Sequence, residues 1–192
     1  MYKVGIFGGT FDPIHLGHLI TGQSVKEIRE LEKIIFIPAF ISPHKSSTET
    51  SSPEDRLKMI KLAIKDIPFF DYSDMEIKMG GVSFTVDTLR ELKKQYENLE
   101  FIIGYDNIFS FNTWKDPDEI MKLSTIIVLK RKSSHAPPFK DKYYNQAVFV
   151  QTRGIEISAT DIRERVKLGK PINFLVPPPV MEYIYKQKLY NE

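Results

Sequence analysis

Residues 8–18, GGTFDPIHLGH, indicate which fold this sequence adopts. They follow the short apolar run Lys3-Val4-Gly5-Ile6-Phe7, which is typical of a buried strand in a parallel sheet. Gly8 and Gly9 lack a Cβ, so the backbone can turn sharply after this strand and bring its N–H groups close to an anion. From about Leu16 the apolar spacing indicates a helix packed on the sheet. The stretch therefore predicts a strand, a glycine turn and a helix.

Two histidines stand at the start of this predicted helix. His15 and His18 would lie on one face of its first turn. A helix N-terminus carries unpaired N–H groups and a partial positive charge, which favour a bound phosphate, and two imidazoles add donors there. A single histidine would more often be a structural residue, but a pair directly after a glycine turn indicates a phosphate site.

Other apolar runs predict the rest of the sheet. Buried strands are expected at residues 33–37, 99–103 and 125–129, with less regular ones at 69–78 and 147–151. Between them, Ser52 reads as a helix N-cap, and Pro177-Pro178-Pro179 introduces a closing helix through Leu189. We therefore expect an α/β fold with a Rossmann-like, doubly wound, mostly parallel sheet and helices on both faces. Residues 1–192 would form one domain, with its site at the carboxyl ends of the strands.

Several loops could supply that site. Residues 38–52 are loop by composition and carry Pro43-His44-Lys45, where a lysine suits phosphate but could also be a solvated surface residue. In the glycine turn before the helix around residues 85–92, Ser83 or Thr85 could cap the helix, or the turn's N–H groups could hold a ligand anion. In residues 157–163, ISATDIR, hydroxyls precede a helix that carries Arg163; this suits a polyphosphate, although capped surface helices are common.

Further candidates follow the strands at 99–103 and 125–129. Gly104 allows close approach of a ligand, and Asp106 could accept hydrogen bonds from a ribose or a base. Trp114 lies in a polar stretch with few apolar neighbours, so a ring-stacking role and an anchoring role are equally open. Arg131 belongs to a basic cluster that outside a binding site is usually a solvated strand end.

Composition excludes several classes of protein. The chain has 192 residues, 42% of them hydrophobic, which suffices for a substantial core. Its net charge of +2 is too small to indicate a nucleic-acid or membrane surface. Without cysteine, neither disulfides nor thiolate chemistry is available. With no apolar leader or membrane-length stretch, a soluble cytoplasmic protein is expected, and a homo-oligomer is left open.

GGTFDPIHLGH resembles the H-x-G-H signature of the nucleotidyltransferase superfamily, whose members join a nucleoside triphosphate to a phosphorylated acceptor and release pyrophosphate. Together with Pro43-His44-Lys45, residues 83–89, Gly104-Tyr105-Asp106, Trp114 and ISATDIR, essentially the whole chain is similar to the bacterial nicotinate-nucleotide adenylyltransferase family. This resemblance implies transfer of the adenylyl group of ATP to nicotinate mononucleotide, giving deamido-NAD and pyrophosphate.

The resemblance also implies three sets of site residues. The catalytic set is His15, His18, Lys45 and Arg163. The ATP-binding set is Gly8, Gly9, Thr10, Phe11, His15, His18, Gly104, Asp106, Arg131, Ser158, Thr160 and Arg163. The set for nicotinate mononucleotide is Gly8, Thr10, His44, Lys45, Thr85 and Trp114. Tyr105 departs from the small residue that is expected there in many relatives, which affects the shape of the adenosine pocket.

The reaction implied is in-line attack by the acceptor's phosphate on the α-phosphorus of ATP, without a protein nucleophile. Mg²⁺ is expected to be held mainly by the ATP phosphates and water, with no protein metal site. Two alternatives remain open: a superfamily relative acting on phosphopantetheine or making CDP-alcohols, and a nucleotide-binding sensor without turnover. Trp114 and residues 83–89 argue against the first, and His15, His18, Lys45 and Arg163 against the second.

Overall fold

The computed structural model describes residues 2–43, 50–130, 140–153 and 155–191. Its strands are β1 (Lys3–Gly9), β2 (Lys33–Pro38), β3 (Phe70–Tyr72), β4 (Asn98–Gly104), β5 (Thr125–Lys130) and β6 (Val148–Gln151). Its helices are α1 (Leu16–Arg29), α2 (Pro53–Ile64), α3 (Met75–Met79), α4 (Thr85–Lys93), the 3₁₀ helix η2 (Tyr105–Thr113), α5 (Pro117–Leu123), α6 (Lys142–Gln146), α7 (Ala159–Lys167) and α8 (Pro178–Lys186).

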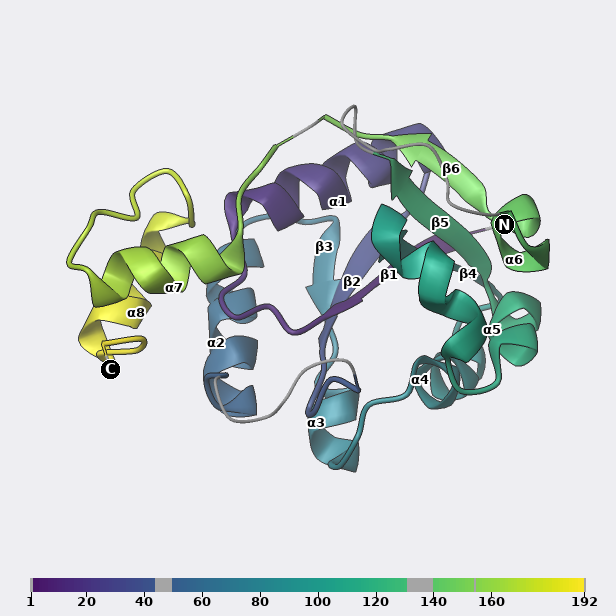
Figure 1. Ribbon diagram of the computed structural model, residues 1–192, viewed down its shortest axis with the longest axis horizontal. Helices are drawn as coiled ribbons and strands as arrows, with labels where there is room; N and C mark the ends of the chain where they lie inside the picture. The colour runs from purple at the N-terminus through teal and green to yellow at the C-terminus, as the bar shows by residue number, and fades with distance from the viewer. Residues whose placement is uncertain (1, 44–49, 131–139, 154, 192) are drawn as a thin grey trace.

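The described strands form one 6-stranded sheet in the order β3-β2-β1-β4-β5-β6, and every neighbouring pair is parallel. This is the Rossmann-like order, in which the chain winds outward from β1 first to one edge and then, from β4, to the other (Figure 1). The predicted fold class is confirmed. Ligands in such sheets bind outside the carboxyl ends of the strands where the winding reverses, here between β1 and β4.

The apolar strands divide their side chains between two cores. In β2, for example, Ile34 and Phe36 face one core whereas Ile35 and Ile37 face the other. The first core contains buried residues of α2, α7 and α8, and the second those of α4, η2, α5 and α6. Both faces of the sheet are therefore covered, which explains why the strands read as continuous apolar runs. No helix in the described ranges is both long and apolar enough to cross a membrane.

The strand predicted at residues 69–78 is wrong over most of its length. Strand β3 covers only Phe70–Tyr72, and Met75–Met79 form helix α3. Because β3 is an edge strand that pairs with β2 alone, the sheet does not hold the following residues in an extended conformation. The Ser73 hydroxyl then accepts a hydrogen bond from the Met75 N–H at 3.3 Å, which favours the turn into α3.

Two predicted helix ends have different outcomes. Ser52 caps α2 as predicted, because its hydroxyl oxygen accepts the Asp55 N–H at 3.0 Å and Pro53 follows as the first helical residue. The closing helix, by contrast, ends at Lys186 instead of continuing through Leu189. Lys188 and Tyr190 both have positive φ, so the chain turns away from the helix axis there.

Candidate active site

The turn between β1 and α1 brings the two histidine rings together. Their centroids are 3.6 Å apart with an interplanar angle of 20°, and His15 is only 6% exposed. The His15 backbone N–H donates to Nδ1 of His18 at 3.3 Å. A neutral His18 ring therefore carries its proton on Nε2, which makes Nε2 a hydrogen-bond donor. The predicted proximity of the two histidines is confirmed.

Aromatic side chains hold the His18 ring. Phe11 and Phe7 meet it edge-on, with centroids 5.1 Å and 6.0 Å from its own. Phe11 itself has a φ of 52°, a left-handed conformation that few bulky residues adopt. A Cβ on Gly9 would lie 3.0 Å from the Phe11 ring, so glycine is needed for this tight turn.

Arg163 joins the second predicted phosphate element to this turn. Its Nη1 donates to the Asp12 carbonyl oxygen at 2.8 Å and its Nη2 to the Thr160 hydroxyl at 3.3 Å. Ser158 is the N-cap of α7, but its side chain makes no capping hydrogen bond within the described helix. The structure thus brings ISATDIR against GGTFDPIHLGH as predicted, and the Ser158 hydroxyl precedes α7 without capping it.

A cavity of about 380 Å³ opens beside the glycine turn. Five of the predicted site residues line it: Gly8, Gly9, Thr10, Thr85 and Trp114. Pro43 also lines it. His44, Lys45 and Arg131 lie outside the described residues. The cavity occupies the end of the sheet that the fold predicts for a ligand.

Trp114 has a different environment from the one predicted. Its ring centroid lies 5.1 Å from that of Phe111 and 6.2 Å from that of Phe101, so it packs on the core. The expectation of few apolar neighbours is therefore wrong, because Phe111 lies three residues earlier in η2 and Phe101 is supplied by β4. Trp114 is nevertheless half-buried and lines the cavity, which leaves part of the ring accessible to a ligand.

Ser83 and Thr85 do not cap α4. The N-cap is Phe84, and Thr85 is already the first helical residue. The Ser83 hydroxyl oxygen instead accepts the Phe40 N–H at 2.9 Å, which ties the loop after β2 to the turn before α4. Both sides of the cavity are thereby joined.

Two charged residues that the sequence analysis did not identify line the described part of the cavity: Glu76 and Lys115. Burial raises the pKa of the Glu76 carboxyl, although the Thr88 hydroxyl donates to it at 2.6 Å. No local pattern marks Glu76, because the sequence of residues 69–78 predicts an irregular strand and not helix α3. Lys115 directly follows Trp114, so a search of the tryptophan's neighbours for cations could have found it.

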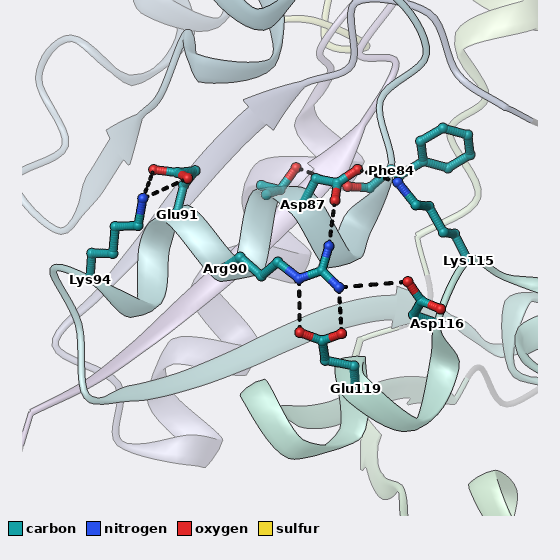
Figure 2. Close-up of polar contacts among 9 residues, drawn as sticks. Phe84, Asp87, Arg90, Glu91, Lys94, Lys115, Asp116 and Glu119 are labelled. Carbon is teal, nitrogen blue, oxygen red and sulfur yellow. Dashed lines mark hydrogen bonds and ion pairs between the residues drawn. The ribbon is translucent and has the colours of Figure 1, made fainter.

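Figure 2 shows the polar contacts that hold Lys115, which also lines the cavity. Its Nζ lies 2.8 Å from Asp87 Oδ2 and 4.7 Å from the centroid of the Phe84 ring. Arg90 donates to Asp87 at 2.8 Å and forms a bidentate salt bridge with Glu119 on α5. This exposed network links the start of α4 to the segment that carries Trp114.

Gly104 and Asp106 are not among the residues that line this cavity. They lie at the carboxyl end of β4 and the start of η2, and Asp106 is exposed. A Cβ on Gly104 would have only the Asn107 side chain within 4 Å, at 3.8 Å, so the space beside it is open. The Tyr105 ring is 8% exposed and packs on Phe109, with centroids 5.0 Å apart. The unusual tyrosine therefore belongs to the core.

Comparison with known proteins agrees with this geometry. Residues 6–165 match the sequence model of the cytidylyltransferase-like family. A protein of Caldicellulosiruptor saccharolyticus, named "Probable nicotinate-nucleotide adenylyltransferase", is 41% identical over 196 residues that cover 99% of this chain and 100% of the relative. A protein of the same name from Hydrogenobaculum sp. is 39% identical, with 97% of each chain covered. This chain belongs to the nicotinate-nucleotide adenylyltransferase family. It is therefore a nucleotidyltransferase.

Solved structures of other proteins share the fold of this adenylyltransferase. The Plasmodium falciparum nicotinic acid mononucleotide adenylyltransferase, complexed with NaAD, aligns with a TM-score of 0.82 at 19% identity and covers 100% of this chain and 98% of its own. The same Plasmodium protein complexed with APC aligns with a TM-score of 0.78 at 18% identity, with the same coverage. At this identity the likeness concerns the fold.

Proposed function

We propose that this enzyme transfers the adenylyl group of ATP to nicotinate mononucleotide, giving nicotinate adenine dinucleotide and pyrophosphate. The observation that carries the proposal is the cavity of about 380 Å³ lined by the glycine turn and by Trp114. The two stacked histidines follow in the same turn. The pyridine ring would lie against the indole, and the 5′-phosphate on its ribose would reach the turn. The names of the relatives support the same pair of substrates.

The acceptor phosphate would attack the α-phosphorus of ATP in line. A bond forms between a phosphate oxygen of the mononucleotide and the α-phosphorus, while the bond from that phosphorus to the bridging oxygen of pyrophosphate breaks. The attacking phosphate is already ionised at neutral pH, so no general base is required. His15, His18 and Arg163 would act as donors to the oxygens on which negative charge builds up. Lys45 would add a further cation.

Mg²⁺ fits this site as an ion that arrives with ATP. Within the described ranges, no group of three or more His, Cys, Asp or Glu side chains could hold a metal, and phosphates with water are common ligands of Mg²⁺. Bound in this way, the ion would neutralise part of the phosphate charge. The contribution of the chain is to position the two polyanions.

Lys115 supports a substrate with an acidic ring substituent. Lys115 lines the cavity together with Trp114, and its ammonium group, which also pairs with Asp87, would stabilise an anion bound nearby. Burial also raises the pKa of the Glu76 carboxyl in the same cavity. We therefore expect nicotinate mononucleotide to be preferred over its amide.

The test is pyrophosphate release from ATP and Mg²⁺ with nicotinate mononucleotide, nicotinamide mononucleotide and phosphopantetheine supplied separately. We expect the highest kcat/KM with the nicotinate acceptor. Release only with phosphopantetheine would contradict the proposed acceptor but not the chemistry. ATP binding without release in any of the three reactions would instead support a nucleotide sensor.

Replacing Gly17 with alanine should lower kcat by about 10- to 100-fold, because small displacements of a catalytic group have effects of this size. The new Cβ would lie 3.0 Å from Nδ1 and 3.1 Å from Cε1 of His15, so the imidazole must move. Stability should not fall, since alanine favours a helix more than glycine does. The measurement is kcat together with the thermal unfolding midpoint.

Gly22→Ala provides the matched control. Gly22 is also a buried glycine of α1, and its new Cβ would meet the Phe70 ring at 3.3 Å instead of a histidine. We expect near-normal kcat for this variant. Equal kcat values for Gly17→Ala and Gly22→Ala would contradict the role given to His15.

A further inference from the structure

Asp12 connects the histidine turn to three distant parts of the chain. Asp12 is buried, with 2% of its surface exposed. Oδ2 accepts the Ser51 backbone N–H at 3.2 Å, and Oδ1 accepts the Tyr190 hydroxyl at 2.6 Å. Its backbone carbonyl accepts the Arg163 guanidinium at 2.8 Å. A carboxylate buried in this way needs such donors, and each of them constrains the turn.

Tyr190 reaches Asp12 from a strained segment. It follows α8, and both it and Lys188 have left-handed backbones, with φ values of 64° and 53°. Non-glycine residues in this region cost free energy and persist where surrounding contacts hold them. Figure 1 shows that α8 lies at one end of the molecule with α7, beside α2. The chain therefore bends back after α8 and brings the phenol to the turn.

The chemistry of the pair suits a fixed contact. Burial, and then the Asp12 carboxylate, raise the pKa of the Tyr190 hydroxyl, so it remains a protonated donor in the neutral range. Hydrogen bonds from a neutral donor to a carboxylate are stronger than those between neutral groups. Asp12 lies three residues before His15 in sequence, within the same turn.

We propose that Tyr190 is a positioning residue for the adenylyl transfer: through Asp12 it holds the turn that carries His15 and His18 in its active shape. This inference rests on the proposed function, because it assigns a use to the histidine pair. Tyr190 itself touches no reacting atom. Its effect should appear in kcat more than in KM, since the histidines act on charge that develops in the transition state.

The test compares Tyr190→Phe with Tyr183→Phe. Tyr183, on α8, also donates its hydroxyl to a carboxylate, that of Asp55 on α2, at 2.7 Å. The two variants lose the same group from the same kind of bond, but Asp55 lies outside the histidine turn. We expect Tyr190→Phe to lower kcat by about 10-fold with KM for both substrates changed less than about threefold. Tyr183→Phe should keep its kcat, with a similar shift in unfolding midpoint.

A double-mutant cycle with Asp12→Asn tests the route of the effect. If Tyr190 acts through the carboxylate, removing its hydroxyl should reduce kcat much less in the Asp12→Asn background than in the wild type. A full additional loss there would overturn the inference, as would equal kcat values for Tyr190→Phe and Tyr183→Phe in an otherwise active enzyme. Absence of pyrophosphate release from the wild type would instead overturn the proposed function, and this inference with it.

Discussion

Replacing His18 with alanine should lower kcat by about 100- to 1000-fold in a protein that still folds. The His15 N–H contact leaves Nε2 of a neutral His18 as the donor, and the edges of Phe11 and Phe7 hold the ring in place. In the proposed reaction, the alanine variant would lose this donor at the α-phosphate of the transferring adenylyl group, where negative charge builds up. Steady-state pyrophosphate release measures the loss, and far-ultraviolet circular dichroism checks the fold.

His18→Gln is the informative companion. The glutamine amide nitrogen can take the place of Nε2, so this variant should recover part of the activity that alanine loses. A ring that serves only to fill space would show no such difference. Near-normal kcat in folded His18→Ala would remove His18 from the mechanism altogether.

Arg56→Met should lower the free energy of unfolding by about 3 kcal/mol, at about 1 kcal/mol for each carbonyl oxygen that loses its hydrogen bond from the buried guanidinium. Arg56 is 1% exposed, and burial lowers the pKa of its guanidinium. It donates to three backbone carbonyl oxygens, those of Thr10 at 2.8 Å, Phe40 at 3.1 Å and Ser51 at 3.1 Å. These carbonyls belong to the loops after β1 and β2 and to the segment before α2. Methionine can fill the space but cannot donate.

Urea unfolding measures this change as a shift of the midpoint at constant slope. Arg90→Met is the control, because Arg90 pairs with Asp87, Asp116 and Glu119 in the exposed network of Figure 2. Such surface pairs contribute little, so we expect a loss below about 1 kcal/mol. Equal losses for the two variants would show that the buried contacts of Arg56 stabilise the fold no more than the exposed pairs of Arg90 do.

Because Thr10 lines the cavity, Arg56→Met should also raise KM for the acceptor.

Much of the fold follows from local pattern. The apolar runs that begin at Lys3, Lys33, Leu99 and Thr125 all belong to strands, and the glycine turn with its two histidines begins α1 as expected. The Ser52 cap is equally local, since its bond spans three residues. At residues 69–78 the prediction was wrong over most of its length, because β3 pairs with β2 only over Phe70–Tyr72.

The candidate site divides in the same way. By itself the sequence determined the alternation of strands and helices and the types of residue that could handle phosphate, because side-chain periodicity, glycine and helix caps act over a few neighbouring residues. Only the tertiary structure decided that Trp114 packs on Phe101 while lining the cavity, that the Ser83 hydroxyl accepts the Phe40 N–H, and that Glu76 and Lys115 line the same cavity. Arg56, Asp12 and Tyr190 meet groups from 5 to 178 positions away. Such contacts depend on which segments the folded sheet brings together, and no local spacing encodes that.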